Sequence, residues 1–146
     1  MKKSVAHFPG DYCHGSPPKW FEIQEGFDKG KSLFYLDFQT RAGTPQATVV
    51  FVHGNPESSY TYRHVIEHLR SSKHCIRIVA MDHIGFGLSD DADFEMVEMH
   101  HAANLLQLVR HLDLQQITLA IHDWGGPIGV GAFIEEAWRV RNLVVM

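Results

Sequence analysis

The sequence of 146 residues combines 45% hydrophobic with 21% charged side chains, a composition typical of a single globular domain with a buried core. A formal net charge of −4 provides no basic surface for nucleic acid or an anionic membrane, and we expect neither as a partner. No run of about 18 apolar residues occurs, and Lys2 and Lys3 precede no apolar stretch of signal-peptide length, so we expect a cytoplasmic protein without a membrane span. Two cysteines, Cys13 and Cys75, are too few for a disulfide framework, and we expect reduced thiols.

Residues 1–18 include the turn-forming sequence HFPGDYCHGSPP, which predicts an irregular N-terminal arm along the surface. We expect residues 19–146 to form the domain itself. Its first elements are predicted at residues 19–24 and 31–40, where apolar and polar side chains alternate on both sides of a turn that contains glycine. This pattern is typical of an antiparallel hairpin with one solvent-exposed face.

From residue 47 onward, continuously apolar segments alternate with segments of helical periodicity. The apolar segments predict buried strands at residues 47–52, 75–82, 116–123 and 142–146. The periodic segments predict helices at residues 59–72 with Ser58 or Ser59 as N-cap, at 94–112, and at 127–139 with Pro127 in the first turn. The side chains predicted to face inward are Tyr62, Val65, Ile66 and Leu69 in the first helix, and Phe94, Val97, His101, Leu105, Leu108 and Leu112 in the second. This alternation predicts an α/β fold with a mostly parallel sheet and helices on both faces.

The last predicted strand, residues 142–146, has no helix after it. One side of the sheet would then be uncovered and one edge unpaired, an arrangement that complete proteins usually avoid. We therefore expect a truncated domain, or one that a partner chain or self-association through the open edge completes.

Three polar motifs follow the buried strands: HGNP at residues 53–56, DHIGFGLSD at 82–90 and HDWGG at 122–126. Ligand sites of open parallel sheets lie at the carboxyl ends of the strands, so we expect the motifs to converge. The third motif stands between a strand and a helix, where α/β-hydrolases hold a nucleophilic serine in the frame G-x-S-x-G; here Asp123 takes its place. In that geometry the backbone N–H groups of Asn55 and Trp124 converge on one oxygen and form an oxyanion hole.

In their order along the chain, HGNPESSYTYR, DHIGFGLSD and ITLAIHDWGGPIG resemble the haloalkane dehalogenase family of α/β-hydrolases, from about Trp20 to the end of the sequence. The resemblance implies that Asp123 is the nucleophile and that the side chains of Asn55 and Trp124 bind the leaving halide. It implies a small halogenated substrate, and we expect neither a cofactor nor a metal. It places the general base, its supporting acid and a helical cap in segments that follow this front half of the domain.

A carboxylate suits this chemistry, because aspartate with an ordinary pKa of about 4 is anionic at neutral pH without a base to activate it. The departing halide gains negative charge, which the indole N–H of Trp124 and the amide N–H of Asn55 stabilise in a dry pocket. The ester left on Asp123 then requires water and a general base. His122 neighbours the nucleophile, but adjacent side chains of a strand project to opposite faces, so we expect it to be structural.

Three alternatives are open. An epoxide hydrolase shares the Asp nucleophile, but these enzymes usually carry an aromatic residue at the position of Asn55 and a glycine at that of Ile121. The segment HVIEH, residues 64–68, fits the spacing of a zinc site, although an ordinary polar helix face explains it better. The third alternative is a catalytically incomplete fragment or interaction module.

Overall fold

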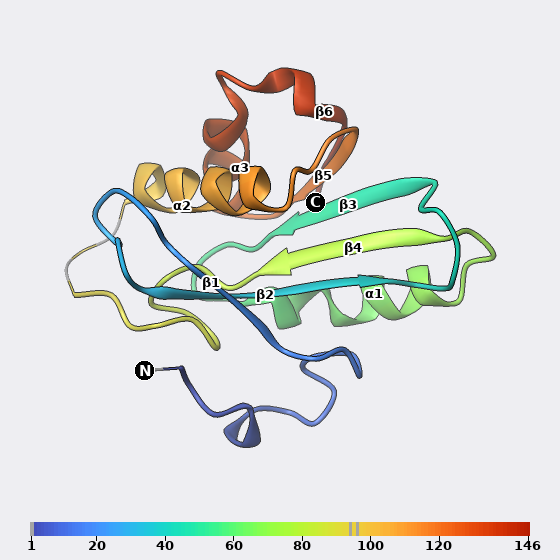
Figure 1. The fold of residues 1–146 in the computed structure, drawn as a ribbon, viewed down its shortest axis with the longest axis horizontal. Helices are drawn as coiled ribbons and strands as arrows, with labels where there is room; N and C mark the ends of the chain where they lie inside the picture. Colours follow the sequence, from blue (N-terminus) through green and yellow to red (C-terminus); the bar gives the residue numbers. More distant parts are fainter. Residues whose placement is uncertain (1, 94, 96) are drawn as a thin grey trace.

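The computed structural model describes residues 2–93, 95 and 97–146, which form a six-stranded sheet with helices on both faces (Figure 1). The strands are β1 (Lys19–Glu22), β2 (Ser32–Gln39), β3 (Ala47–Val52), β4 (Ile76–Met81), β5 (Ile117–Ile121) and β6 (Val140–Val145). The helices are α1 (Arg63–Arg70), α2 (Glu98–His111) and α3 (Gly125–Phe133), with short 3-10 helices η1 (Val5–His7), η2 (Ser59–Tyr62) and η3 (Ala137–Arg139). The predicted α/β fold is confirmed.

The sheet has the strand order β1-β2-β4-β3-β5-β6. The pairs β1–β2 and β2–β4 are antiparallel, whereas β4, β3, β5 and β6 run parallel, so the predicted hairpin and the mostly parallel sheet are both confirmed. At the centre, Val50 of β3 lies opposite Val79 of β4 and Leu119 of β5, and all three side chains are buried. The loop that follows β3 therefore opens at the middle of the sheet's carboxyl edge.

Helices α2 and α3 cover one face of the sheet and lie above it in Figure 1. Leu105 and Leu108 of α2 and Ile128 of α3 belong to one buried cluster with Val50 and Leu119 of the strands. Full burial of a leucine or isoleucine side chain contributes about 1.5–3 kcal/mol. Because α3 begins directly behind β5, this cluster also fixes the position of the segment that joins the two elements.

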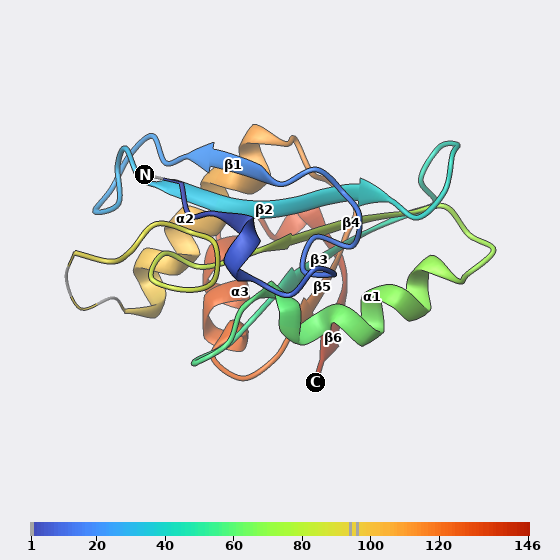
Figure 2. The same cartoon turned by 90° about the horizontal axis from the view of Figure 1, so that it is seen from below.

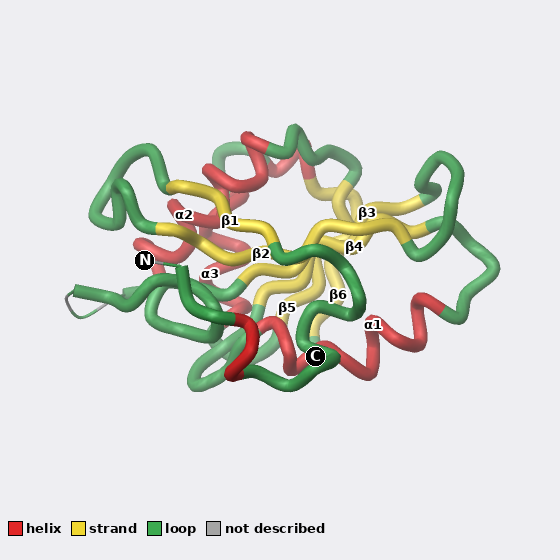
Figure 3. The backbone as a smooth tube through the Cα atoms, turned by 60° about the horizontal axis from the view of Figure 1, so that its bottom comes forward, coloured by secondary structure: helices red, strands yellow, loops and turns green. Residues whose placement is uncertain are grey.

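Helix α1 and the N-terminal arm, residues 2–18, cover the opposite face, which Figure 2 presents from below. Ile66 of α1 and Tyr12 of the arm belong to a second buried cluster with Phe34 and Phe51. Figure 3 draws the arm mostly as loop, interrupted by the short helix η1. The arm is thus irregular in backbone but contributes buried side chains to the core.

The prediction that the hairpin has one solvent-exposed face is wrong for β2. Leu33 and Tyr35 point into the cluster beneath α2, while Phe34 and Leu36 point into the cluster beneath the arm, and all four are buried. Alternation predicts one wet face only when nothing packs on the polar side, and here the N-terminal arm covers it.

The first helix is shorter than predicted. Its expected first turn is the 3-10 helix η2, and Ser58 caps that turn by accepting a hydrogen bond from the Tyr60 backbone N–H at 3.3 Å. Ile66 is fully buried, but Val65, predicted to face inward, is 41% exposed. Val65 lies beside the narrow stripe through which this eight-residue helix contacts the sheet.

The other two helices also differ at their ends. Helix α2 begins at Glu98, because Val97 is extended and 47% exposed instead of facing inward, and Phe94 lies outside the described residues. Helix α3 begins at Gly125, two residues earlier than predicted, and ends at Phe133 instead of continuing to residue 139. Its early start places Pro127 within the first turn, where the missing N–H costs nothing.

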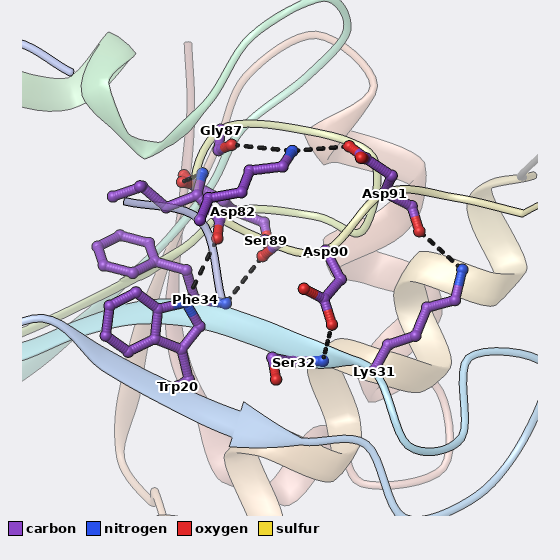
Figure 4. A network of polar contacts seen from close by, with 11 residues as sticks. Trp20, Lys31, Ser32, Phe34, Asp82, Gly87, Ser89, Asp90 and Asp91 are labelled. Atoms are coloured by element: carbon purple, nitrogen blue, oxygen red, sulfur yellow. Dashed lines mark hydrogen bonds and ion pairs between the residues drawn. The ribbon is translucent and has the colours of Figure 1, made fainter. Parts of the chain in front are cut away.

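The loop after β4, residues 82–91, is tied to β2 by side chains that take the place of a neighbouring strand (Figure 4). The hydroxyl of Ser89 accepts a hydrogen bond from the Phe34 backbone N–H at 2.8 Å, and the carboxylate of Asp90 accepts one from Ser32 at 2.9 Å. These bonds satisfy backbone donors at the start of β2 and fix the loop near the carboxyl edge of the parallel strands.

Asp82, the first residue of this loop, is fully buried and joins three parts of the chain. Its carboxylate accepts hydrogen bonds from the Tyr12 hydroxyl and from the backbone N–H groups of Ser59 and Leu88, each at 2.8 Å. Burial, and then the charge of Asp82, raise the pKa of Tyr12, so the phenol stays a neutral donor. A Cβ at Gly87 would lie 2.1 Å from the Asp82 Oδ2, so only glycine fits there.

Within the described residues, no helix has both the length and the apolar character needed to cross a membrane.

We expect Asp82→Ala to lower the free energy of unfolding by at least about 3 kcal/mol, because three buried donors lose their acceptor. Urea denaturation at neutral pH measures this loss. Asp91→Ala is the matched control, because this carboxylate in the same loop is 85% exposed and pairs with Lys3 at 2.8 Å. Similar losses in the two variants would contradict the central role of Asp82.

Candidate active site

Two segments meet at the carboxyl edge of the sheet: the β3 loop, residues 53–58, and the elbow, residues 122–124, between β5 and α3. Asp123 has a φ of +53°, in the left-handed region that residues other than glycine rarely adopt. A Cβ on Gly125 would stand 2.1 Å from the Val52 carbonyl oxygen, and one on Gly54 would stand 2.5 Å from the Asp123 side chain. The two glycines therefore permit a contact that any larger residue would prevent.

The carboxylate of Asp123 lies against the two backbone donors expected to form an oxyanion hole. The backbone N–H of Asn55 donates a hydrogen bond to its Oδ1 at 3.1 Å. The backbone N–H groups of Trp124 and Asn55 hold the pKa of Asp123 below its ordinary value. The side chain is thus an anion at neutral pH. In the structure, the donors predicted for a later oxyanion stabilise the charge of Asp123 itself.

A pocket of about 490 Å³ opens beside the elbow. Its wall includes both side chains predicted to bind halide, Asn55 and Trp124, together with the apolar Phe86 and Ile128. Trp124 lines the pocket and is 52% exposed. The structure therefore brings the three predicted site residues together, although the sequence separates Asn55 from Asp123 by 68 positions.

Three histidines that sequence analysis did not assign to the site are packed together beside the pocket, and two of them form part of its wall. His53, His83 and His101 are buried, with ring centroids 4.1 Å apart for the first two and 4.8 Å apart for the last two. His53 Nε2 accepts a hydrogen bond from the His83 backbone N–H at 3.0 Å. His83 and His101 line the pocket itself.

Burial is the main cause that lowers the pKa of all three imidazoles, that of His101 to about 4 and that of His83 well below its ordinary value. The wall is therefore neutral at physiological pH. His53 and His83 belong to the motifs HGNP and DHIGFGLSD, which follow strands. That position was the sequence signal that could have assigned them to the site.

His122, expected to be structural, has a partner in the β3 loop. Its Nδ1 lies 3.2 Å from Oε2 of Glu57. In the segment HVIEH, the carboxylate of Glu67 is hydrogen-bonded to Nδ1 of His14 at 2.8 Å instead. Among the described residues, no three His, Cys, Asp or Glu side chains are grouped to hold a metal ion.

Comparison with known proteins agrees with the fold. The family model of the alpha/beta hydrolase fold matches residues 47–146, which include the β3 loop, the elbow and the strands that carry them. The chain belongs to the alpha/beta hydrolase fold family. The family resemblance and the hydrolase-type fold expected from the sequence are thus confirmed.

Two curated relatives of this alpha/beta hydrolase chain differ in their named activities. It is 33% identical over 147 residues to the cis-3-alkyl-4-alkyloxetan-2-one decarboxylase of Xanthomonas campestris, a match that covers 94% of the chain and 45% of the relative. It is 34% identical over 143 residues to haloalkane dehalogenase 2 of Mycobacterium tuberculosis, covering 97% of the chain and 46% of the relative.

Among solved structures, haloalkane dehalogenase DpaA from Paraglaciecola agarilytica NO2 matches with a TM-score of 0.81 and 28% identity, covering 98% of this chain and 47% of that chain. The alpha/beta hydrolase chain spans less than half of the length of each of these three proteins.

Two neighbouring glycines of α3 provide a test of the tight elbow. We expect Gly125→Ala to destabilise the chain by about 3 kcal/mol, because the new methyl group overlaps the Val52 carbonyl. Gly126→Ala is the matched control, since its nearest neighbour would be 3.9 Å away and alanine favours a helix by up to about 1 kcal/mol. Thermal unfolding measures both, and equal stability of the two variants would contradict the close approach.

The low pKa of His101 predicts a loss of stability in acid. Between about pH 6.5 and pH 4, the unfolded chain takes up a proton that the folded chain excludes, so the free energy of unfolding falls as the pH falls. We expect His101→Phe to remove up to about 3 kcal/mol of this loss. Urea denaturation across this range measures how the free energy of unfolding changes with pH. His64→Phe, at an exposed position of helix α1, serves as the control. An unchanged slope in His101→Phe would contradict the neutral wall.

Proposed function

We propose that this chain carries the nucleophile and the halide-binding groups of a haloalkane dehalogenase, in which Asp123 displaces a halide from a saturated carbon. The observation that supports this most is the carboxylate of Asp123, held as an anion by two backbone N–H groups beside a pocket lined by Asn55 and Trp124. An anionic nucleophile needs no base in this step. The whole protein's substrate would be a small halogenated compound.

In the first step, one oxygen of Asp123 attacks the carbon and the carbon–halogen bond breaks. The electron pair leaves with the halide, and an alkyl ester remains on the carboxyl group. The indole N–H of Trp124 and the amide N–H of Asn55 would stabilise the departing anion from the pocket wall. In the second step, water attacks the ester carbonyl, and the backbone N–H groups of Asn55 and Trp124 would bind the oxyanion.

The second step also requires a general base. By resemblance, that histidine and its acid come from segments that follow this half of the domain. The described residues therefore support the first step by themselves. We expect an ester that accumulates on Asp123, because its formation needs no base while its hydrolysis does.

The oxetan-2-one named for one relative is a second candidate substrate. A strained lactone offers a carbonyl carbon, and the two N–H groups at Asp123 suit the oxyanion that its attack would produce. An epoxide hydrolase is less well supported, since Asn55 and Ile121 stand where those enzymes usually carry an aromatic residue and a glycine.

An interaction module is the remaining alternative. The edge strand β6 exposes apolar side chains, with Leu143 52% and Val145 72% exposed. Such an edge favours a completing chain or self-association. Size-exclusion chromatography of the chain at several concentrations would detect self-association as a shift in apparent mass.

The proposal predicts a covalent product. After incubation with 1-bromobutane, we expect intact-mass spectrometry to detect one added butyl group, mapped to Asp123, with about one equivalent of bromide released per chain. The rate should be constant between about pH 5 and pH 8, because the pKa of Asp123 lies below its ordinary value of about 4.

Asp123→Asn is the control, since it keeps the shape of the side chain and removes its charge. An adduct of equal yield in that variant, or none in a folded wild-type chain, would overturn the proposal. A 3,4-dialkyl-oxetan-2-one assayed in parallel separates the two substrate classes. Consumption of the lactone without any bromide release would favour the second candidate.

A further inference from the structure

Glu57 in the β3 loop connects the two segments that form the site. Its Oε2 accepts a hydrogen bond from the Gly54 backbone N–H at 3.2 Å and lies 3.2 Å from Nδ1 of His122 in the elbow. The backbone N–H of Glu57 also donates to the Gly54 carbonyl at 3.3 Å. One oxygen of Glu57 therefore binds a backbone N–H within the β3 loop and also contacts the elbow, which carries Asp123.

Both partners of Glu57 adjoin Asp123. Gly54 is packed so closely against the Asp123 side chain that a Cβ would lie 2.5 Å from it. His122 precedes Asp123 in the chain. The carboxylate of Glu57 thus acts on both sides of the nucleophile, through its neighbour in the β3 loop and its neighbour in the elbow.

The side chains of the bridge are only partly exposed, 23% for Glu57 and 41% for His122. At that degree of exposure the pair adds little to global stability. The pair does affect the distance between the β3 loop and Asp123. The backbone N–H of Asn55, next to Gly54 in the loop, donates to Asp123 Oδ1 at 3.1 Å. A shift of the loop would change both that bond and the direction of the attacking carboxylate.

We infer that Glu57 is a positioning residue. It holds the β3 loop against the elbow, so that the Asn55 N–H stays within hydrogen-bond distance of Asp123. The inference rests on the proposed function of Asp123 as the nucleophile. Misplacement of a reacting group by about 1 Å can slow a reaction by up to about a hundredfold. Loss of the bridge therefore affects the rate of ester formation more than the binding of substrate, since Glu57 itself is not among the residues that line the pocket.

The first test compares Glu57→Ala with Glu57→Gln. Both hydrogen bonds of Glu57 end on one oxygen, so the amide oxygen of glutamine can accept both, whereas alanine accepts neither. We expect Glu57→Ala to slow butyl ester formation on Asp123 about tenfold at saturating 1-bromobutane, with half-saturation changed less than twofold. Glu57→Gln should restore the rate to within about twofold of wild type.

Glu67→Ala is the matched control, because it removes the carboxylate of another histidine–glutamate pair, His14–Glu67 at 2.8 Å, on a helix far along the chain from the elbow. We expect its alkylation rate to equal that of wild type. His122→Ala removes the other half of the bridge, and the double variant with Glu57→Ala should be no slower than the slower single variant. Additive effects of the two changes would overturn the inference.

A second measurement does not depend on catalysis. Hydrogen exchange of the Gly54 and Asn55 amides, followed by NMR, should accelerate about tenfold in Glu57→Ala and stay near the wild-type rate in Glu57→Gln and Glu67→Ala. Unchanged exchange in Glu57→Ala would overturn the bridge even if no alkylation occurs in any variant. Absence of alkylation in the wild type, with the exchange pattern as expected, would overturn the proposed function and leave the bridge as a structural clamp.

Discussion

The site depends on the parallel pairing of β3 with β5, which places Val52 opposite Ile121 at the last step of the ladder. This register makes the β3 loop and the elbow leave the sheet side by side, with backbone against backbone. A slip by one residue would turn every side chain of the strand to the other face, so the buried apolar residues of β3 strongly specify the register. The glycines at 54 and 125 then let two chains that are already adjacent come into contact.

The electrostatics of the site follow from what surrounds this contact. Backbone donors hold the charge of Asp123, while the imidazole wall is neutral because burial makes its protonation costly. The described lining of the pocket carries the carboxylate of Glu98 and no lysine or arginine. Under the proposed function, such a pocket would suit a neutral substrate that releases an anion to weak N–H donors, and it would disfavour one that arrives with a negative charge.

The sequence could predict those parts of the fold and of the candidate site that depend on short-range patterns. Continuous apolar runs identified the strands, and the glycines around Asp123 identified the elbow, because a tight turn restricts its residues locally. The wet face assigned to β2 and the inward place of Val65 were wrong, because each depends on what packs there. Val97 was predicted to fill the core, yet it precedes its helix and lines the pocket. The histidine cluster was signalled only by the position of His53 and His83 in motifs that follow strands. The bridge of Glu57 has no local pattern, since it joins residues that are distant in the sequence.

The N-terminal arm has a consequence for how the chain acquires its fold during synthesis. Tyr12 binds Asp82, a partner 70 positions further along the chain, and the arm also covers the second face of β2. On the ribosome, the arm and the hairpin emerge well before β4 and its loop exist. Until then their apolar faces have no core to join, and such transiently exposed apolar surface makes a partly folded chain prone to aggregation.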